Sequence, residues 1–295
     1  MPKKPNKDNP KCPFCNNKPA VKNGSRKIKQ RTYQRYLCKA CNKYFTLQPP
    51  QQKSKTYNLQ TILNSISKYN LGQPLRKLPL PKSTIHNWIN TINLPMNRLR
   101  NKIKHLPKHN IIKKQRFIHH KQPFLYQYHK LKLEFSKKFP GLVDYIQNVH
   151  KIPTNIFNNS NRISQAKAKQ EFNITEKQNY AVELAKLAAA ITTNNKQRHN
   201  IIENFMLIND TATIATEIPV YLLSKTQKNL TGHIDILQLR FHKIYILDYK
   251  PTPVNKTQTI NQLILYRKAL SKRTQIPKHK FKLAFFNDKG YYEIN

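Results

Sequence analysis

Residues 231–250 read TGHIDILQLRFHKIYILDYK, and they give the clearest indication of the chain's architecture. Strand-like runs at 232–239 and 242–249 flank a short turn around Arg240, which is the pattern of a β-hairpin. Further elements are expected as a strand at 213–223, helices at 176–193, 197–207 and 257–270, and a last strand at 281–286. Helices followed by closely spaced strands predict an α/β domain over residues 161–295.

Two acidic residues of this stretch lie where a catalytic site would need them. Asp235 and Asp248 stand on the two strands of the hairpin, so that both can approach one metal ion. Lys250 points to the same face as Asp248, because side chains alternate along a strand. The acids would hold Mg²⁺ or Mn²⁺, and the lysine would orient or deprotonate a bound water and offset charge on a phosphorane. The set favours phosphodiester hydrolysis; a surface salt-bridge cluster is the alternative.

The same residues carry a family resemblance. The motifs Gly232-His-Ile-Asp235, Asp248-Tyr-Lys250-Pro and Gln262-x3-Tyr266 resemble those of the PD-(D/E)xK nuclease superfamily, in its RecB-like branch. The resemblance covers roughly residues 170–290. It implies an α/β restriction-endonuclease-like fold, in which helices flank a mixed sheet, and it gives Gln262 and Tyr266 roles in catalysis and DNA contact.

The resemblance implies two more site residues. The branch uses a metal-binding histidine on an earlier helix, and His199 is the matching position. Many such nucleases also have an acid on the intervening strand, which here is Glu217. A solvent-facing histidine at 199 and a simple ion pair at 217 are the alternatives. The implied cofactor is a catalytic Mg²⁺ or Mn²⁺ held by His199, Asp235 and Asp248.

All four cysteines lie near the N-terminus, as Cys12-x2-Cys15 and Cys38-x2-Cys41. Two such pairs close a four-sulfur Zn²⁺ site, and so small a core needs the metal for its folding energy. The spacing predicts a zinc ribbon over residues 1–48 with a structural zinc ion. Disulfides, free thiols and an iron–sulfur cluster are the alternatives. The run resembles the N-terminal ribbons of insertion-sequence transposases.

The charge distribution indicates a polyanionic partner. The chain of 295 residues has a formal net charge of +41, and residues 1–133 contain 30 Lys plus Arg but only one acid, Asp8. An A/T-rich coding bias would add lysine but would not readily remove acids. Such a segment repels itself unless it meets a polyanion, and nucleic acid is the commonest one. An acidic membrane surface or a structural ribosomal role are the alternatives.

A helix-turn-helix is expected over residues 55–105. Apolar spacing predicts a first helix from Leu59, a turn with Gly72 and Pro74, and a second helix around 83–92. The second helix resembles the recognition helices of transposases and their regulators. Its outward residues would contact DNA, and asparagine can read adenine edges; these residues are Thr84, His86, Asn87 and Asn90. An ordinary helical hairpin is the alternative.

Residues 106–160 are expected to form a basic connector, with a helix at 126–139. Its first part mixes cations with aromatic residues, which suits backbone contact and stacking on single strands. The cations that would contact DNA are Lys113, Lys114 and Arg116. A solvated linker is an equal alternative for this segment.

The leading hypothesis is a metal-dependent DNA endonuclease that a zinc ribbon and a helix-turn-helix target to DNA, in mobile-element biology or genome maintenance. A DNA-binding regulator with a silent nuclease fold, or a structure-selective junction or flap nuclease, are the alternatives. DNA is the expected partner, with a second copy of the chain or mobile-element proteins as further candidates. No run of about 18 apolar residues and no signal peptide is seen. The expected location is therefore the cytoplasm, or the nucleoid in a prokaryote, without a membrane.

Overall fold

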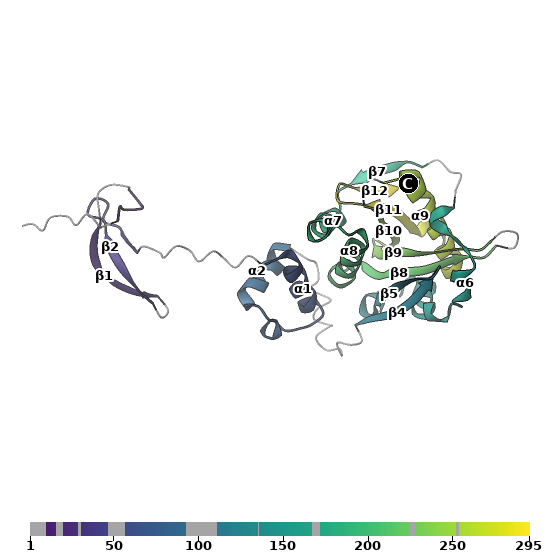
Figure 1. Ribbon diagram of the computed structural model, residues 1–295, viewed down its shortest axis with the longest axis horizontal. Helices are drawn as coiled ribbons and strands as arrows, with labels where there is room; N and C mark the ends of the chain where they lie inside the picture. Colours follow the sequence, from purple (N-terminus) through teal and green to yellow (C-terminus); the bar gives the residue numbers. More distant parts are fainter. Residues whose placement is uncertain are drawn as a thin grey trace, which may run out of the picture. The chain divides into compact units, whose positions relative to one another are not determined.

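The computed structural model describes residues 10–15, 20–28, 31–46, 57–92, 111–134, 136–166, 172–224, 228–251 and 254–295. The chain divides into two compact units, residues 1–57 and 58–295. Figure 1 labels their helices and strands. Each unit is described by itself.

The first unit is a small antiparallel sheet. Its strands are β1 (Val21–Ile28), β2 (Arg31–Leu37) and β3 (Tyr44–Thr46), with β2 in the middle. The buried residues are few: Tyr36 and Phe45 stack at 5.6 Å between ring centroids, beside Cys12 and Cys38. A core of this size buries too little apolar surface to hold a fold alone.

The second unit begins with a helical pair. Helix α1 (Leu59–Asn70) is capped by Asn58, whose side chain accepts a hydrogen bond from the Thr61 amide. The turn η1 (Leu75–Lys77) leads to α2 (Lys82–Ile92). The two helices expected in this region are confirmed; residues 93–105 of the predicted module lie outside the described residues.

A nine-stranded mixed sheet forms the larger part of the second unit. Its main path runs β4-β5-β8-β9-β10-β11-β12-β7, and along it only β10 and β11 are parallel. The strands are β4 (Ile112–His119), β5 (Gln122–His129), β8 (Thr213–Leu222), β9 (Leu230–Arg240), β10 (Lys243–Tyr249), β11 (Phe281–Phe286), β12 (Tyr291–Ile294) and β7 (Ile174–Lys177). The short β6 (Asn161–Arg162) runs parallel to β9.

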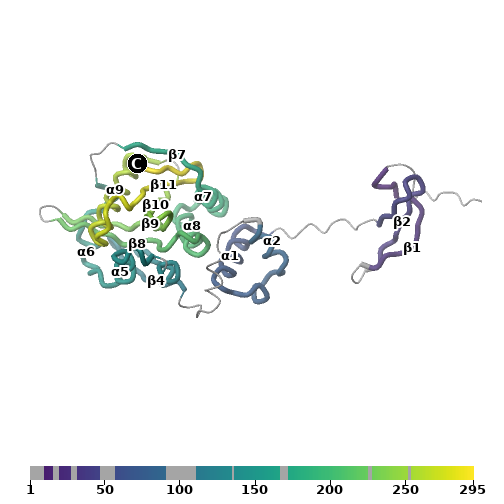
Figure 2. Tube along the Cα trace, turned by 180° about the vertical axis from the view of Figure 1, so that it is seen from behind, coloured from purple at the N-terminus to yellow at the C-terminus, as the bar shows by residue number. Residues whose placement is uncertain are grey.

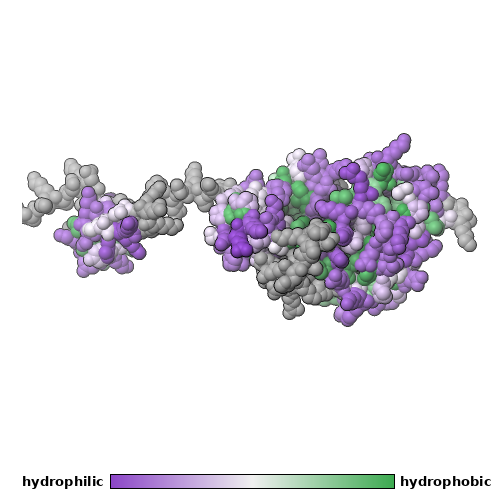
Figure 3. Space-filling view, turned by 90° about the horizontal axis from the view of Figure 1, so that it is seen from below, coloured by the Kyte–Doolittle hydropathy of each residue, from purple (hydrophilic) through white to green (hydrophobic). Residues whose placement is uncertain are grey.

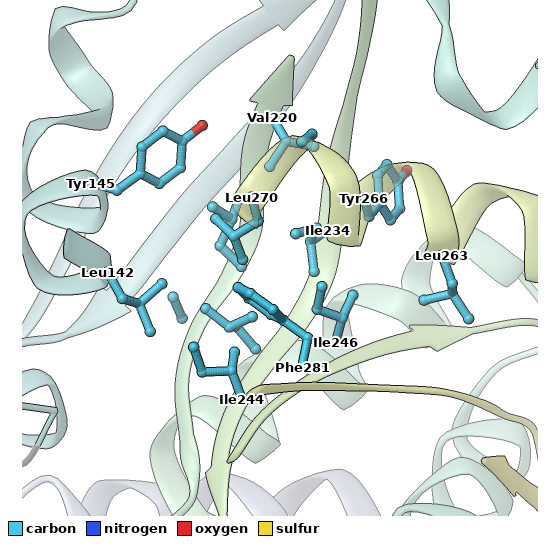
Figure 4. Close-up of a cluster of buried hydrophobic side chains, with 14 of the residues drawn as sticks. Leu142, Tyr145, Val220, Ile234, Ile244, Ile246, Leu263, Tyr266, Leu270 and Phe281 are labelled. Carbon is cyan, nitrogen blue, oxygen red and sulfur yellow. The ribbon is translucent and has the colours of Figure 1, made fainter. Parts of the chain in front are cut away.

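Helices cover both faces of this sheet (Figures 1 and 2). On one face α9 (Lys256–Thr274) and α5 (Pro140–Asn148) pack over a large apolar core. Figure 4 shows Leu263, Tyr266 and Leu270 facing side chains of the sheet there. On the other face lie α7 (Tyr180–Ile191) and α8 (Asn195–Asn209). Short helical segments complete the unit: α4 (Lys130–Glu134), η3 (Val149–Lys151), α6 (Asn155–Asn158), η4 (Ile163–Gln165) and η5 (Lys278–Lys280).

The prediction of a basic connector over residues 106–160 is wrong for its described part. Strands β4 and β5 pair with each other, and Gln127 and Tyr128 of β5 pair with β8. The helix expected at 126–139 is also wrong, since strand β5 continues to His129 and α4 is short. The physical reason is burial: Phe117 and Tyr126 join the main core and hold this hairpin on the sheet.

On the face that Figure 3 shows, the described residues are mostly hydrophilic, with small separate apolar patches on the larger unit. Among the described helices, none combines the length and the apolar character that crossing a bilayer requires.

Candidate functional site

The four cysteines converge in the first unit. The Sγ atoms of Cys12 and Cys41 are 3.7 Å apart, and those of Cys15 and Cys38 are 3.6 Å apart. A tetrahedral ion with Zn–S bonds of about 2.3 Å would separate its sulfurs by about 3.8 Å, whereas a disulfide needs about 2.05 Å. None of the four cysteines forms a disulfide, and their thiols lie close enough to hold a structural metal such as zinc. The disulfide alternative therefore does not fit this geometry.

The two acids of the hairpin lie across from each other. Leu247 of β10 pairs with Ile236 of β9, so Asp248 and Asp235 occupy the next positions on the two strands. Asp248 is completely buried and Asp235 is 6% exposed. The amide of Tyr249 donates a hydrogen bond of 3.0 Å to Oδ2 of Asp235, which fixes that carboxylate at the end of the paired region.

Lys250 and the helix α9 both reach Asp248. Nζ of Lys250 lies 3.0 Å from Oδ1 and 2.8 Å from Oδ2 of this carboxylate. Nε2 of Gln262 donates to the same Oδ1 at 3.2 Å and to the hydroxyl of Tyr266 at 2.8 Å. Gln262 and Tyr266 are one helical turn apart on α9. The structure therefore brings Asp235, Lys250, Gln262 and Tyr266 together around Asp248, as the sequence predicts.

The close packing of Tyr266 explains the glycine of the first motif. A Cβ on Gly232 would lie 2.7 Å from Cε1 of Tyr266 and 3.2 Å from its hydroxyl. These distances are too short for a side chain, so a larger residue would displace the tyrosine from Gln262.

Helix α8 contributes two potential metal ligands from the opposite face of the sheet. Nδ1 of His199 lies 3.7 Å from Oδ2 of Asp235 and 3.6 Å from Oε1 of Glu203. His199 also meets the Tyr249 ring edge-on at 4.8 Å. One ligand atom from each of His199, Glu203 and Asp235 lies within 4.8 Å of the others, which makes these three residues a possible metal site.

Glu217 lies on β8 in a strained conformation. Its φ is 52°, a value that residues other than glycine rarely adopt and that is often found at functional sites. The register places it opposite Asp235, because Thr216 pairs with Ile236 and Ile218 pairs with Ile234. Its carboxylate forms an ion pair with Nδ1 of His233. Glu217 thus belongs to the same cluster of side chains.

Burial governs the electrostatics of these acids. Burial raises the pKa values of Asp235 and Asp248 to about 6 each, and it raises the pKa of Glu203 well above its usual value. Burial alone would also raise the pKa of Glu217, but the adjacent imidazolium of His233 lowers it. Oε1 of Glu203 is buried without a hydrogen bond. A bound cation would offset the repulsion among these buried carboxylates and would give Oε1 of Glu203 a partner. The donor set therefore fits Mg²⁺ or Mn²⁺.

The residues expected to contact DNA lie on two separate elements. On α2, His86, Asn87 and Asn90 are exposed and Thr84 is half-buried, while Ile85 is fully buried. On β4, the three cations Lys113, Lys114 and Arg116 are all exposed. Arg116 lines a cleft of about 810 Å³ that also contains His199, Glu203, Glu217 and His233.

Sequence reasoning missed Glu203 as a ligand. The signal was present, because a residue four positions after His199 on a helix lies on the same face. Arg116 was expected on a connector, and its place beside the acids follows only from the pairing of β4 and β5. Comparisons with protein-family models, curated proteins and solved structures gave no match for this chain.

Proposed function

We propose that this chain is a Mg²⁺- or Mn²⁺-dependent DNA nuclease of the PD-(D/E)xK type, in its RecB-like branch. The observation that carries the proposal is the cross-strand pair Asp235 and Asp248 with Lys250 bonded to Asp248. His199 and Glu203 add ligands from a second element. Burying ionisable groups costs free energy, so a cluster of buried acids with raised pKa values beside a lysine is typical of a functional site.

The metal, when bound, would polarise the scissile phosphate and lower the pKa of a coordinated water. His199, Glu203 and Asp235 would hold it, because one ligand atom of each lies within 4.8 Å of the others, and Asp248 would add a carboxylate from the neighbouring strand. Lys250 would orient the attacking water and offset charge on the phosphate. Gln262 and Tyr266 hold the Asp248 carboxylate in place through their hydrogen bonds.

Targeting would come from the N-terminal parts of the chain. The cysteine cluster would hold a structural zinc ion in a ribbon, and α2 would present His86, Asn87 and Asn90 to a major groove. The high positive charge of residues 1–133 would strengthen binding to the phosphate backbone. For the ribbon, we expect one zinc ion per chain in elemental analysis, and Cys38→Ser should lose most of it.

Two other functions remain to be separated by experiment. A DNA-binding regulator with a silent nuclease fold would bind duplex DNA without cutting it, and a junction or flap nuclease would cut only branched DNA. The complete set of Asp235, Asp248, Lys250 and Gln262 favours an active enzyme, because a silent site has no need of all four.

The test is cleavage of linear duplex, single-stranded and branched DNA with Mg²⁺ or Mn²⁺, comparing the wild type with Asp248→Ala. Cleavage of linear duplex by the wild type alone supports the endonuclease. Cleavage confined to branched DNA supports the junction or flap enzyme. Tight binding without any cleavage supports the regulator.

A further inference from the structure

Two cavities of the second unit share residues. The first is the cleft of about 810 Å³ that is lined by the candidate metal ligands His199 and Glu203. The second, of about 370 Å³, lies against α1 and is lined by Gln60, Asn64 and Ser67. Asn200 and Asn204 of α8 line both cavities, so the two cavities adjoin along α8; together they are called the groove.

Helix α8 forms the floor of this groove. Its lining residues run from Asn195 to Ile208, which is about 20 Å along a helix axis. Lys196, Asn200, Asn204 and Ile208 are spaced by four residues and so form one row along the helix. The axial length equals about six base pairs of B-form DNA.

The charges of the groove are arranged along its length. The acids that line it, Glu203 and Glu217, lie in the cleft with the metal ligands. Arg116, Arg162 and Lys196 also line the cleft, and Lys114 lines the part beside α1, where no acid is among the lining residues. Oε1 of Gln127, which lines the cleft, is buried without a hydrogen bond.

Helix α1 is fixed to α8 as the wall of the groove. Leu63 packs into the apolar core formed by α7, α8 and the sheet. Nδ2 of Asn70 donates to Oδ1 of Asn209 at 2.8 Å, and Nδ2 of Asn209 donates to Oγ of Ser67 at 3.0 Å. Asn209 is completely buried and Asn70 is 5% exposed, so a hydrogen-bonded contact beneath the surface joins the helical pair to the helix of the metal site.

We propose that this groove along α8 holds one strand of DNA through its phosphates, between β4 and α1. This inference rests on the proposed function and names the route of its substrate. Helix α1 is then part of the substrate path, and the strand passes from Lys114 and Asn64 to the metal ligands. The helical pair of α1 and α2 therefore lies at a fixed distance from the phosphodiester bond that is cut.

The test measures DNA binding by the full zinc-loaded chain, without Mg²⁺ or Mn²⁺, on single-stranded DNA over a range of salt. Lys114→Ala should lower the slope of log K against log salt by about 0.7, the value for one phosphate contact on a single strand. Asn64→Glu places a negative charge on the α1 wall and should weaken binding at least about fivefold.

The matched controls lie toward β7, which is at the opposite end of the strand order from β4. Lys289→Ala, in the turn between β11 and β12, and Asn173→Glu, just before β7, make the same chemical changes at exposed positions. Both should bind DNA like the wild type. All four variants should show the wild-type melting temperature, which excludes unfolding as the cause.

If Lys114→Ala and Asn64→Glu bind DNA like the wild type, the proposed groove is wrong. It is also wrong if the two control variants lose as much DNA affinity as the groove variants. This readout needs no cleavage. If the groove variants lose binding and the wild type never cuts DNA, the groove stands and the nuclease proposal fails. If the wild type cuts DNA and the groove variants bind normally, the nuclease stands and the groove fails.

Discussion

Nζ of Lys250 lies within 3.0 Å of both carboxylate oxygens of Asp248, at the point where β10 leaves the sheet. The negative charge of Asp248 raises the pKa of Lys250 despite burial, which would lower it. The lysine is therefore charged and held in one position. Its side chain is 29% exposed, whereas that of Asp248 is 1% exposed.

Replacement of this lysine should abolish cleavage with little change in fold. We expect Lys250→Ala to reduce the single-turnover rate by about 10²- to 10³-fold, because a positioned charge at the reacting phosphate is lost. Lys243→Ala, at a half-buried lysine at the other end of the same strand, is the control and should retain the wild-type rate. Equal rates for wild type and Lys250→Ala would exclude a catalytic role for this lysine.

The pKa values of the two aspartates predict how stability depends on pH. Burial raises both to about 6, so the metal-free folded chain binds protons more tightly than the unfolded chain. Their contribution to stability is therefore complete below about pH 4 and is lost as the pH rises through about 6. A bound cation requires the ionised forms. We expect Mn²⁺ to raise the melting temperature more at about pH 7.5 than at about pH 5.

The control for this pH dependence is Asp248→Asn, which removes one of the titrating groups. Its melting temperature should respond less to Mn²⁺ at the higher pH than that of the wild type. A Mn²⁺ effect of the same size at both pH values in the wild type would contradict the assignment of these acids as ligands.

Glu203 should act as a metal ligand although no motif marks it. Oε1 of this buried residue has no hydrogen bond and lies 3.6 Å from Nδ1 of His199. We expect Glu203→Gln to weaken Mn²⁺ binding about 10- to 100-fold in calorimetric titration. Glu183→Gln, on the exposed face of α7, should bind Mn²⁺ like the wild type. Unchanged affinity in Glu203→Gln would remove this residue from the site.

Gly232 should be intolerant of a side chain for steric reasons. A Cβ at this position would lie 2.7 Å from the Tyr266 ring, so we expect Gly232→Ala to lower the free energy of unfolding by about 1–3 kcal/mol. The same substitution should cost much less in a Tyr266→Ala background, since the obstructing ring is gone. Urea unfolding of the four proteins in this cycle gives the coupling. Additive effects would mean that the two residues do not clash.

Local patterns predicted the strands and helices around the site well. The strand-like runs at 213–223, 232–239 and 242–249 correspond to β8, β9 and β10, and the helices expected at 197–207 and 257–270 correspond to α8 and α9. The meeting of Asp235, Asp248 and Lys250 followed from the short turn between the two strands, because a tight hairpin leaves only one register.

Long-range pairing was not predictable in the same way. Proline is uncommon inside sheets, yet Pro123 lies in β5 at a position that pairs with β4, while β8 pairs with Gln127 and Tyr128 further along. The positive φ of Glu217 could not be predicted from the sequence, because this position holds neither glycine nor asparagine, which adopt such values more readily. The wall of the candidate cleft therefore appears only when the sheet is assembled.

The most direct test of the central claim is a single-turnover cleavage assay of end-labelled DNA with Mn²⁺, with the wild type and Asp248→Asn purified in parallel. The substitution keeps the shape of the side chain and removes its charge. We expect cleavage by the wild type and a rate lower by about 10³-fold in the variant. Equal rates in the two proteins, or no cleavage by a wild type that binds DNA and Mn²⁺, would contradict it.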